Sequence, residues 1–157
     1  MRTAIGGLLL AVFALSGCPG DDPVSPDGNL LTGTWGGENV TVILEDNVAH
    51  VHIGCTNGDF PAPLVVDEDD RINTSGSYLL RAYPVAIGPT LPAQLAGVID
   101  GRRLTFTVAV NDTVEKKLVV LGPVTVTLGR EPRMGPCPIC VRPKASAAVS
   151  RLTLNER

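Results

Sequence analysis

The sequence predicts an all-β protein, a small antiparallel up-and-down β-barrel of about eight strands, with a β-sandwich as the alternative. Three observations favour this fold class. Apolar residues recur with the period of two that strands require, rather than the helical period of about 3.6. Turn-forming residues separate the apolar segments at intervals of roughly 8 to 12 residues. Glycine and proline account for 17 and 13 of the 157 residues, which argues against long helices.

The first predicted hairpin shows the alternation clearly. Residues 40–44 are Val-Thr-Val-Ile-Leu, and after the turn sequence Glu-Asp-Asn the apolar pattern returns at 48–53. Alternate residues of a strand share one face, so His50 and His52 lie together on the face opposite the apolar one. We therefore expect a β-hairpin with its apolar side turned to the core.

Further strands are predicted along the rest of the chain. A short apolar run at 64–66 ends in the acidic residues 67–70, and the Pro-rich stretch 84–92 should be a loop. The pair Asp100-Gly101 is the strongest hairpin signal in the chain. The other candidate strands are 76–83, 94–99, 103–110, 114–121 and 124–128. Because consecutive hairpins close most simply into a ring, which removes exposed edges, a barrel is favoured over a sandwich.

The N-terminal residues indicate export from the cytosol. Residues 4–15 are all apolar or Gly, a run of twelve, which is too short for the roughly 20 residues of a spanning helix. The run ends in Leu15-Ser16-Gly17-Cys18, which resembles the lipobox of bacterial lipoproteins. The resemblance implies that a diacylglyceryl group is attached to the Cys18 thiol, that residues 1–17 are removed, and that acyl chains hold the mature protein on a membrane.

The same resemblance predicts the domain organisation and the cellular location. Residues 1–17 would be the signal peptide, 18–29 the lipidated cysteine and a flexible linker, 30–140 the β-barrel domain and 141–157 a C-terminal tail. The protein would be anchored by lipid in the bacterial cell envelope. Pro19 stands where some enterobacterial lipoproteins carry the Asp that retains them in the inner membrane, which favours the outer membrane.

A short motif at the first strand adds support for a barrel. Gly33-Thr34-Trp35 resembles the Gly-x-Trp of lipocalins, and Arg130 follows the last predicted strand, where lipocalins carry an arginine. The resemblance implies that Trp35 plugs the closed end of the barrel and that Arg130 stacks on it. At about 110 residues the barrel is smaller than a lipocalin, so side chains alone could fill it. Extended to Gly33–Gly37, the motif also resembles bacterial hypothetical lipoproteins without an assigned activity.

Three cysteines remain beside Cys18, in a protein expected to meet conditions in which disulfides persist. Cys55 follows the second predicted strand and Cys137 follows the last, so a bridge between them would fasten the C-terminal tail to the barrel. We expect the Cys55–Cys137 pairing, with Cys55–Cys140 and Cys137–Cys140 as alternatives. The segment Cys137-Pro138-Ile139-Cys140 also resembles the glutaredoxin active site, but the helix and the βαβ unit on which that chemistry depends are not predicted.

A zinc site is the alternative use of these residues. His50 and His52 share a strand face, Cys55 follows three residues later, and imidazole and thiolate are zinc ligands. A disulfide at Cys55 would consume its thiol. The main prediction is therefore two partly exposed histidines, with no metal and no cofactor.

The composition and the motifs of the sequence limit the classes of function that it favours. A net charge of -3 without a run of basic residues makes nucleic acid an unsuitable partner. The sequence contains no nucleophile elbow, catalytic carboxylate pair or phosphate loop, so it offers no candidate catalytic residues. It predicts a noncatalytic, membrane-anchored module that binds a protein partner or a small apolar ligand. The alternatives are a zinc-binding or enzymatic envelope protein using His50, His52 and Cys55, and a lipocalin-like protease inhibitor.

Overall fold

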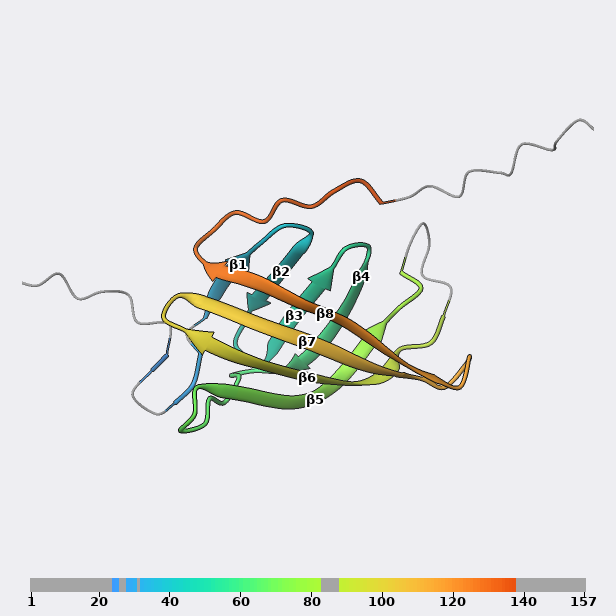
Figure 1. The fold of residues 1–157 in the computed structure, drawn as a ribbon, viewed down its shortest axis with the longest axis horizontal. Coiled ribbons are helices and arrows are strands. Elements are labelled where there is room, and N and C mark those ends of the chain that lie inside the picture. The colour runs from blue at the N-terminus through green and yellow to red at the C-terminus, as the bar shows by residue number, and fades with distance from the viewer. Residues whose placement is uncertain (1–23, 26–27, 31, 83–87, 138–157) are drawn as a thin grey trace, which may run out of the picture.

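The computed structural model describes residues 24–25, 28–30, 32–82 and 88–137, and this part of the chain folds as a closed antiparallel barrel (Figure 1). Each strand pairs with the next along the chain, and the last pairs with the first, which excludes the sandwich. The strands are β1 (Gly33–Gly36), β2 (Val40–Leu44), β3 (Val48–Ile53), β4 (Thr56–Pro61), β5 (Arg71–Leu79), β6 (Leu91–Asp100), β7 (Arg103–Asp112) and β8 (Lys117–Leu128).

The ring is closed by a short contact between its ends. Trp35 and Gly36 of β1 pair with Leu128 and Thr127 of β8. The β7–β8 ladder, in contrast, extends from Arg103 at one end to the hairpin tip at the other. The two strands therefore continue well past β1, as Figure 1 shows.

Strand β4 is not among the predicted strands, because its sequence, Thr-Asn-Gly-Asp-Phe-Pro, has little apolar alternation. It nevertheless pairs with β3 along its whole length, and Phe60 is buried. Residues 64–66, which were expected to form a strand, make only isolated bridges, at Val65 and Val66. Pairing with a well-formed neighbour has overridden weak local preference here.

Strand β8 joins two segments that the sequence predicts as separate strands. Gly122 and Pro123 both lie opposite Thr107, so the ladder continues through a β-bulge. The φ of Gly122 is 100°, a conformation that glycine adopts without the steric cost of a side chain. The interruption predicted from Gly-Pro is thus a local irregularity within one strand.

Other boundaries also differ from the prediction. Strand β5 spans Arg71–Leu79 rather than 76–83, because its pairing with β6 begins before the predicted segment, and β8 begins at Lys117 rather than at residue 114. Strand β6 begins at Leu91, inside the predicted loop 84–92, of which residues 84–87 lie outside the described part. The folded part also begins before residue 30: Val24 bridges to Leu30, and the amide of Val66 donates to the carbonyl oxygen of Gly28 over 2.6 Å. The end of the predicted linker is therefore attached to the barrel.

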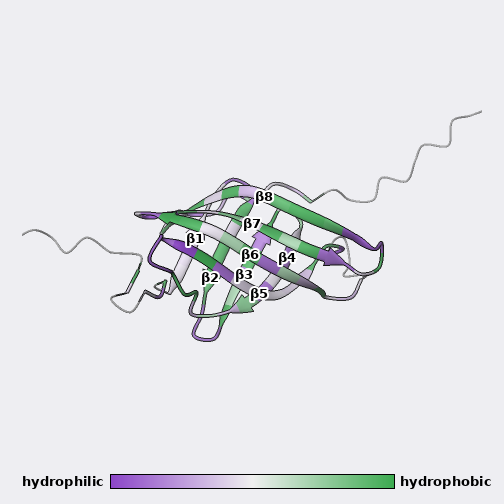
Figure 2. Cartoon of the chain, turned by 60° about the horizontal axis from the view of Figure 1, so that its bottom comes forward, coloured by the Kyte–Doolittle hydropathy of each residue, from purple (hydrophilic) through white to green (hydrophobic). Residues whose placement is uncertain are grey.

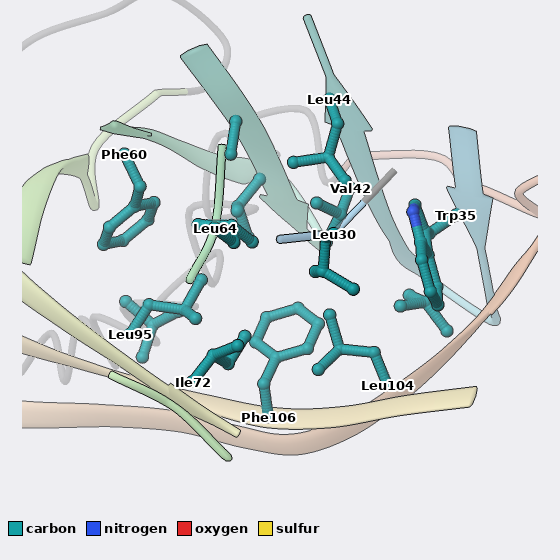
Figure 3. Close-up of a cluster of buried hydrophobic side chains, with 14 of the residues drawn as sticks. Leu30, Trp35, Val42, Leu44, Phe60, Leu64, Ile72, Leu95, Leu104 and Phe106 are labelled. Atoms are coloured by element: carbon teal, nitrogen blue, oxygen red, sulfur yellow. The ribbon is translucent and has the colours of Figure 1, made fainter. Parts of the chain in front are cut away.

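The barrel interior is packed with apolar side chains from every strand (Figure 3). Along β7, alternate residues from Leu104 to Val110 are buried, as their alternation predicts. The absence of a side chain makes room for large neighbours: a Cβ on Gly97 would lie 2.7 Å from the Cβ of Phe106. Small residues opposite large ones let the interior reach normal protein packing.

Among the residues that the structure describes, none belongs to a helix with the length and apolarity needed to cross a membrane.

Candidate functional site

The disulfide predicted between Cys55 and Cys137 is present. It joins residues 82 positions apart, with a Cα–Cα distance of 5.5 Å. Cys55 lies in the tight turn between β3 and β4, after Gly54, whose φ is 59°. The prediction of this pairing is confirmed, whereas Cys140, its alternative partner, lies outside the described residues.

The segment that follows β8 is held along the turn between β1 and β2 before it reaches the disulfide. The amide of Arg133 donates to the carbonyl oxygen of Gly37 over 3.0 Å, and the amide of Asn39 donates to that of Arg133 over 2.8 Å. The amide of Gly135 donates to Oδ1 of Asn39 over 2.6 Å. Figure 1 shows this segment passing over β1 and β2. Backbone bonds and a covalent bond therefore fix the same short stretch.

Trp35 and Arg130 occupy different environments. Trp35 is completely buried, and within the described residues its Nε1 has no hydrogen-bond partner. Its carbonyl oxygen accepts from Oγ1 of Thr41 over 3.0 Å. The Arg130 guanidinium donates to the Glu38 carboxylate over 3.2 Å, and that carboxylate also pairs with Arg133. The packing of Trp35 is shown, whereas the stacking of Arg130 on it stays a prediction.

The two histidines lie on the outer side of β3, and the proposed zinc-ligand set is wrong at one position. Nδ1 of His50 lies 2.6 Å from Oδ1 of Asp59, its cross-strand neighbour. His52 pairs with Asn57 across the same ladder. Cys55 cannot supply a thiolate, because its sulfur is bonded to Cys137. Within the described ranges, no three His, Cys, Asp or Glu side chains are grouped as metal ligands.

The sequence did not identify a charged cluster at the end of β7. The Asp112 side chain is 1% exposed, and its Oδ2 accepts from the Arg81 guanidinium over 2.7 Å. Arg81 also donates to Glu115 over 2.8 Å, and Glu115 in turn pairs with Lys117. This network connects the loop after β5 with the β7–β8 hairpin.

Asp112 also organises the hairpin turn itself. Its Oδ1 accepts from the amides of Val114 and Glu115, over 3.0 and 3.1 Å. The hydrogen bond from Arg81, together with these amides, lowers the pKa of Asp112 against the opposing effect of desolvation. Extending the inward alternation of β7 by one step, from Val110 to residue 112, would have placed this carboxylate inside.

Tyr78 is the other buried polar side chain of note. Its hydroxyl lies 2.8 Å from Oγ1 of Thr56. Burial raises the pKa of Tyr78 to about 12, although the hydrogen bond with Thr56 acts in the opposite direction. The phenol is therefore neutral and serves to join β4 with β5.

The outer side of β5 to β8 carries two open hollows, beside a third, of about 580 Å³, whose lining includes the charged Glu38, Arg103 and Arg130. One, of about 410 Å³, is lined largely by small and uncharged side chains, among them Ala96, Val98 and Thr107. The second, of about 320 Å³, includes Ala109 and Leu118. Both open to solvent rather than into the packed interior, so this side of the barrel offers an extended, weakly polar surface.

Comparison with known proteins found no family model, no curated protein and no solved structure that matches this chain.

Proposed function

We propose that this protein is a lipid-anchored, noncatalytic binding module of the bacterial cell envelope that engages a protein partner through the outside of its barrel. The observation that carries the proposal is the contrast between the two sides of the sheet. The interior is occupied by buried apolar side chains, whereas the outer side of β5 to β8 has open, weakly polar hollows. Surfaces of this kind suit protein contacts.

The filled interior makes the exterior the better-supported binding surface. A small apolar ligand inside the barrel would have to displace buried side chains such as Phe106 and Leu95, which lie in the packed core (Figure 3). Opening a packed core costs several kcal/mol for each large side chain, about 3 to 5 for a phenylalanine. A partner on the outside meets no such cost.

The proposal of a noncatalytic role rests on how the polar side chains are used. Asp112 is engaged by Arg81 and by two turn amides, and the Tyr78 hydroxyl is bonded to Thr56. The pKa of Asp112 is lowered and that of Tyr78 is raised, so near neutral pH Asp112 stays ionised and Tyr78 stays protonated. Such groups stabilise the fold and are poorly suited to proton transfer.

The proposed location in the cell envelope rests on the resemblance of Leu15-Ser16-Gly17-Cys18 to a lipobox. Two or three acyl chains on this residue would hold the protein on a membrane, where one chain gives only marginal binding. The tail disulfide fits an oxidising compartment, because such bonds are rare in the cytosol.

The binding surface is tested by cross-linking on intact cells with the full chain and two arginine variants. Ala96→Arg places a long charged side chain in the larger hollow, and Val65→Arg changes a residue that is 66% exposed and lies outside both hollows. We expect one cross-linked partner to be lost with Ala96→Arg and kept with Val65→Arg. Equal capture by both variants would show that the hollow is not the binding surface.

A further inference from the structure

The first residues of β8 form an unoccupied sheet edge. Residues Lys117–Leu121 pair with β7 on one side. On the other side β1 reaches only Thr127 and Leu128, so within the described residues no strand lies beside Lys117–Leu121. This edge presents backbone amides and carbonyl groups to solvent in the arrangement that another strand can pair with.

Both faces of this edge segment are apolar. Leu118 and Val120 on the outer side are 68% and 57% exposed. Val119 and Leu121 on the inner side are only partly buried. A continuous apolar run is typical of strands covered on both faces, yet here the outer face has no cover. Figure 2 shows the hydrophobic stretch along β8 ending at the hydrophilic hairpin tip.

The usual protection of an edge is confined to the two ends of the segment. Lys117 supplies a charge at the start, and Pro123, in the β-bulge, lacks an amide proton beyond the end. Between these two residues the segment has neither a charge nor a proline. The bulge limits how far a pairing could extend and leaves residues 117–121 as its core.

We propose that a second copy of this chain adds its own Lys117–Leu121 to this edge, antiparallel about a two-fold axis, and forms a dimer with a sheet that continues across both barrels. The charges suit this occupant. In the antiparallel arrangement, Lys117 of each copy lies beside the uncharged end of the other copy's segment, so like charges do not meet. The same patch serves both copies, as a two-fold interface requires.

The dimer covers what the single barrel leaves open. Leu118 and Val120 of one copy pack beside the same residues of the other on the outer face of the joined sheet. On the inner face, Val119 lies beside Val119 of the other copy, and Leu121 lies beside the other copy's Lys117. The inference goes beyond the proposed binding function and does not depend on the lipid anchor or on the identity of a partner.

The test measures the mass of the full chain in detergent by sedimentation over about a hundredfold range of protein concentration. We expect the wild type to pass from monomer to dimer as concentration rises. Val120→Lys and Leu118→Lys each place like charges across the interface, and each should move the midpoint at least about tenfold higher. Val65→Lys is the matched control at an equally exposed position and should leave the midpoint unchanged.

Correct folding of each variant is checked by its far-ultraviolet circular dichroism and by the presence of the Cys55–Cys137 disulfide. Two β8 variants are used so that a folding failure in one leaves the other informative. A wild type that remains monomeric throughout would overturn the proposal. So would a dimer that tolerates both β8 variants, or one that Val65→Lys disrupts equally.

Discussion

Removal of the Cys55–Cys137 disulfide should cost a large part of the stability of the barrel. The bridge closes a loop of 82 residues. On the chain-entropy model, a loop of this length lowers the entropy of the unfolded chain enough to stabilise the fold by about 4.5 kcal/mol at 25 °C. Since small domains have unfolding free energies of about 5 to 15 kcal/mol, a contribution of about 4.5 kcal/mol is roughly 30% or more of the total.

The variant Cys137→Ala tests this value in urea unfolding of the full chain. We expect the unfolding free energy to fall by about 4 to 5 kcal/mol. The dependence of that free energy on urea should become steeper, because an unfolded chain without the cross-link exposes more surface. Cys140→Ala is the control that removes a cysteine without removing the Cys55–Cys137 bond, and it should change stability by less than about 0.5 kcal/mol.

Two results would refute this reasoning. A loss below about 1 kcal/mol in Cys137→Ala would mean that the loop constraint contributes little, contrary to the entropy argument. An equal loss in Cys140→Ala would mean that the loss is not specific to the Cys55–Cys137 bond.

Three further predictions concern buried groups. The pKa of Asp112 is lowered, so the stability that its ionised carboxylate contributes is present above the ordinary carboxyl pKa and is lost as the pH falls through the folded value. Urea unfolding measured from pH 7 downward should show this loss in the wild type and not in Asp112→Asn. Burial raises the pKa of Tyr78 to about 12, so ultraviolet titration should show one tyrosine ionisation well above pH 10, and this step should be missing in Tyr78→Phe. The free energy of unfolding that this group contributes should decline as the pH rises from 10 towards 12. Phe106 is 1% exposed, and Phe106→Ala should lower the free energy of unfolding, measured in urea, by about 3 to 5 kcal/mol. The control Val98→Ala, on the outer face, should change the same quantity by less than about 1 kcal/mol.

The sequence predicts the barrel well where apolar alternation is strong. Strands β2 and β3 have the expected bounds, and β7 extends two residues past its predicted end. Alternation depends on one side of each strand facing the core, so it is visible without knowledge of the partner strand. The same pattern placed His50 and His52 on the outer side correctly.

The prediction fails where a strand is defined by its neighbours. Nothing in the residues of β4 distinguishes them from a loop, and only the complete ladder with β3 makes them a strand. The bulge at Gly122 and Pro123 is similar, because a Gly-Pro pair usually marks the end of a strand rather than an irregularity inside it.

The polar sites divide in the same way. The Cys55–Cys137 pair could be predicted from strand order, since both cysteines follow strands that lie in one ring. The Arg81–Asp112 pair could not, because Arg81 was expected in the strand 76–83 and instead lies in the loop after β5. Side chains from loops are positioned by the tertiary fold, and local sequence says little about their partners.

The central proposal, a barrel attached to the envelope by lipid at Cys18, is tested most directly by intact-mass and peptide mass spectrometry of the chain purified from bacterial membranes. The account predicts a mature protein that begins at Cys18 and carries acyl chains on that residue. A chain that keeps residues 1–17, or one with an unmodified thiol at Cys18, would contradict it.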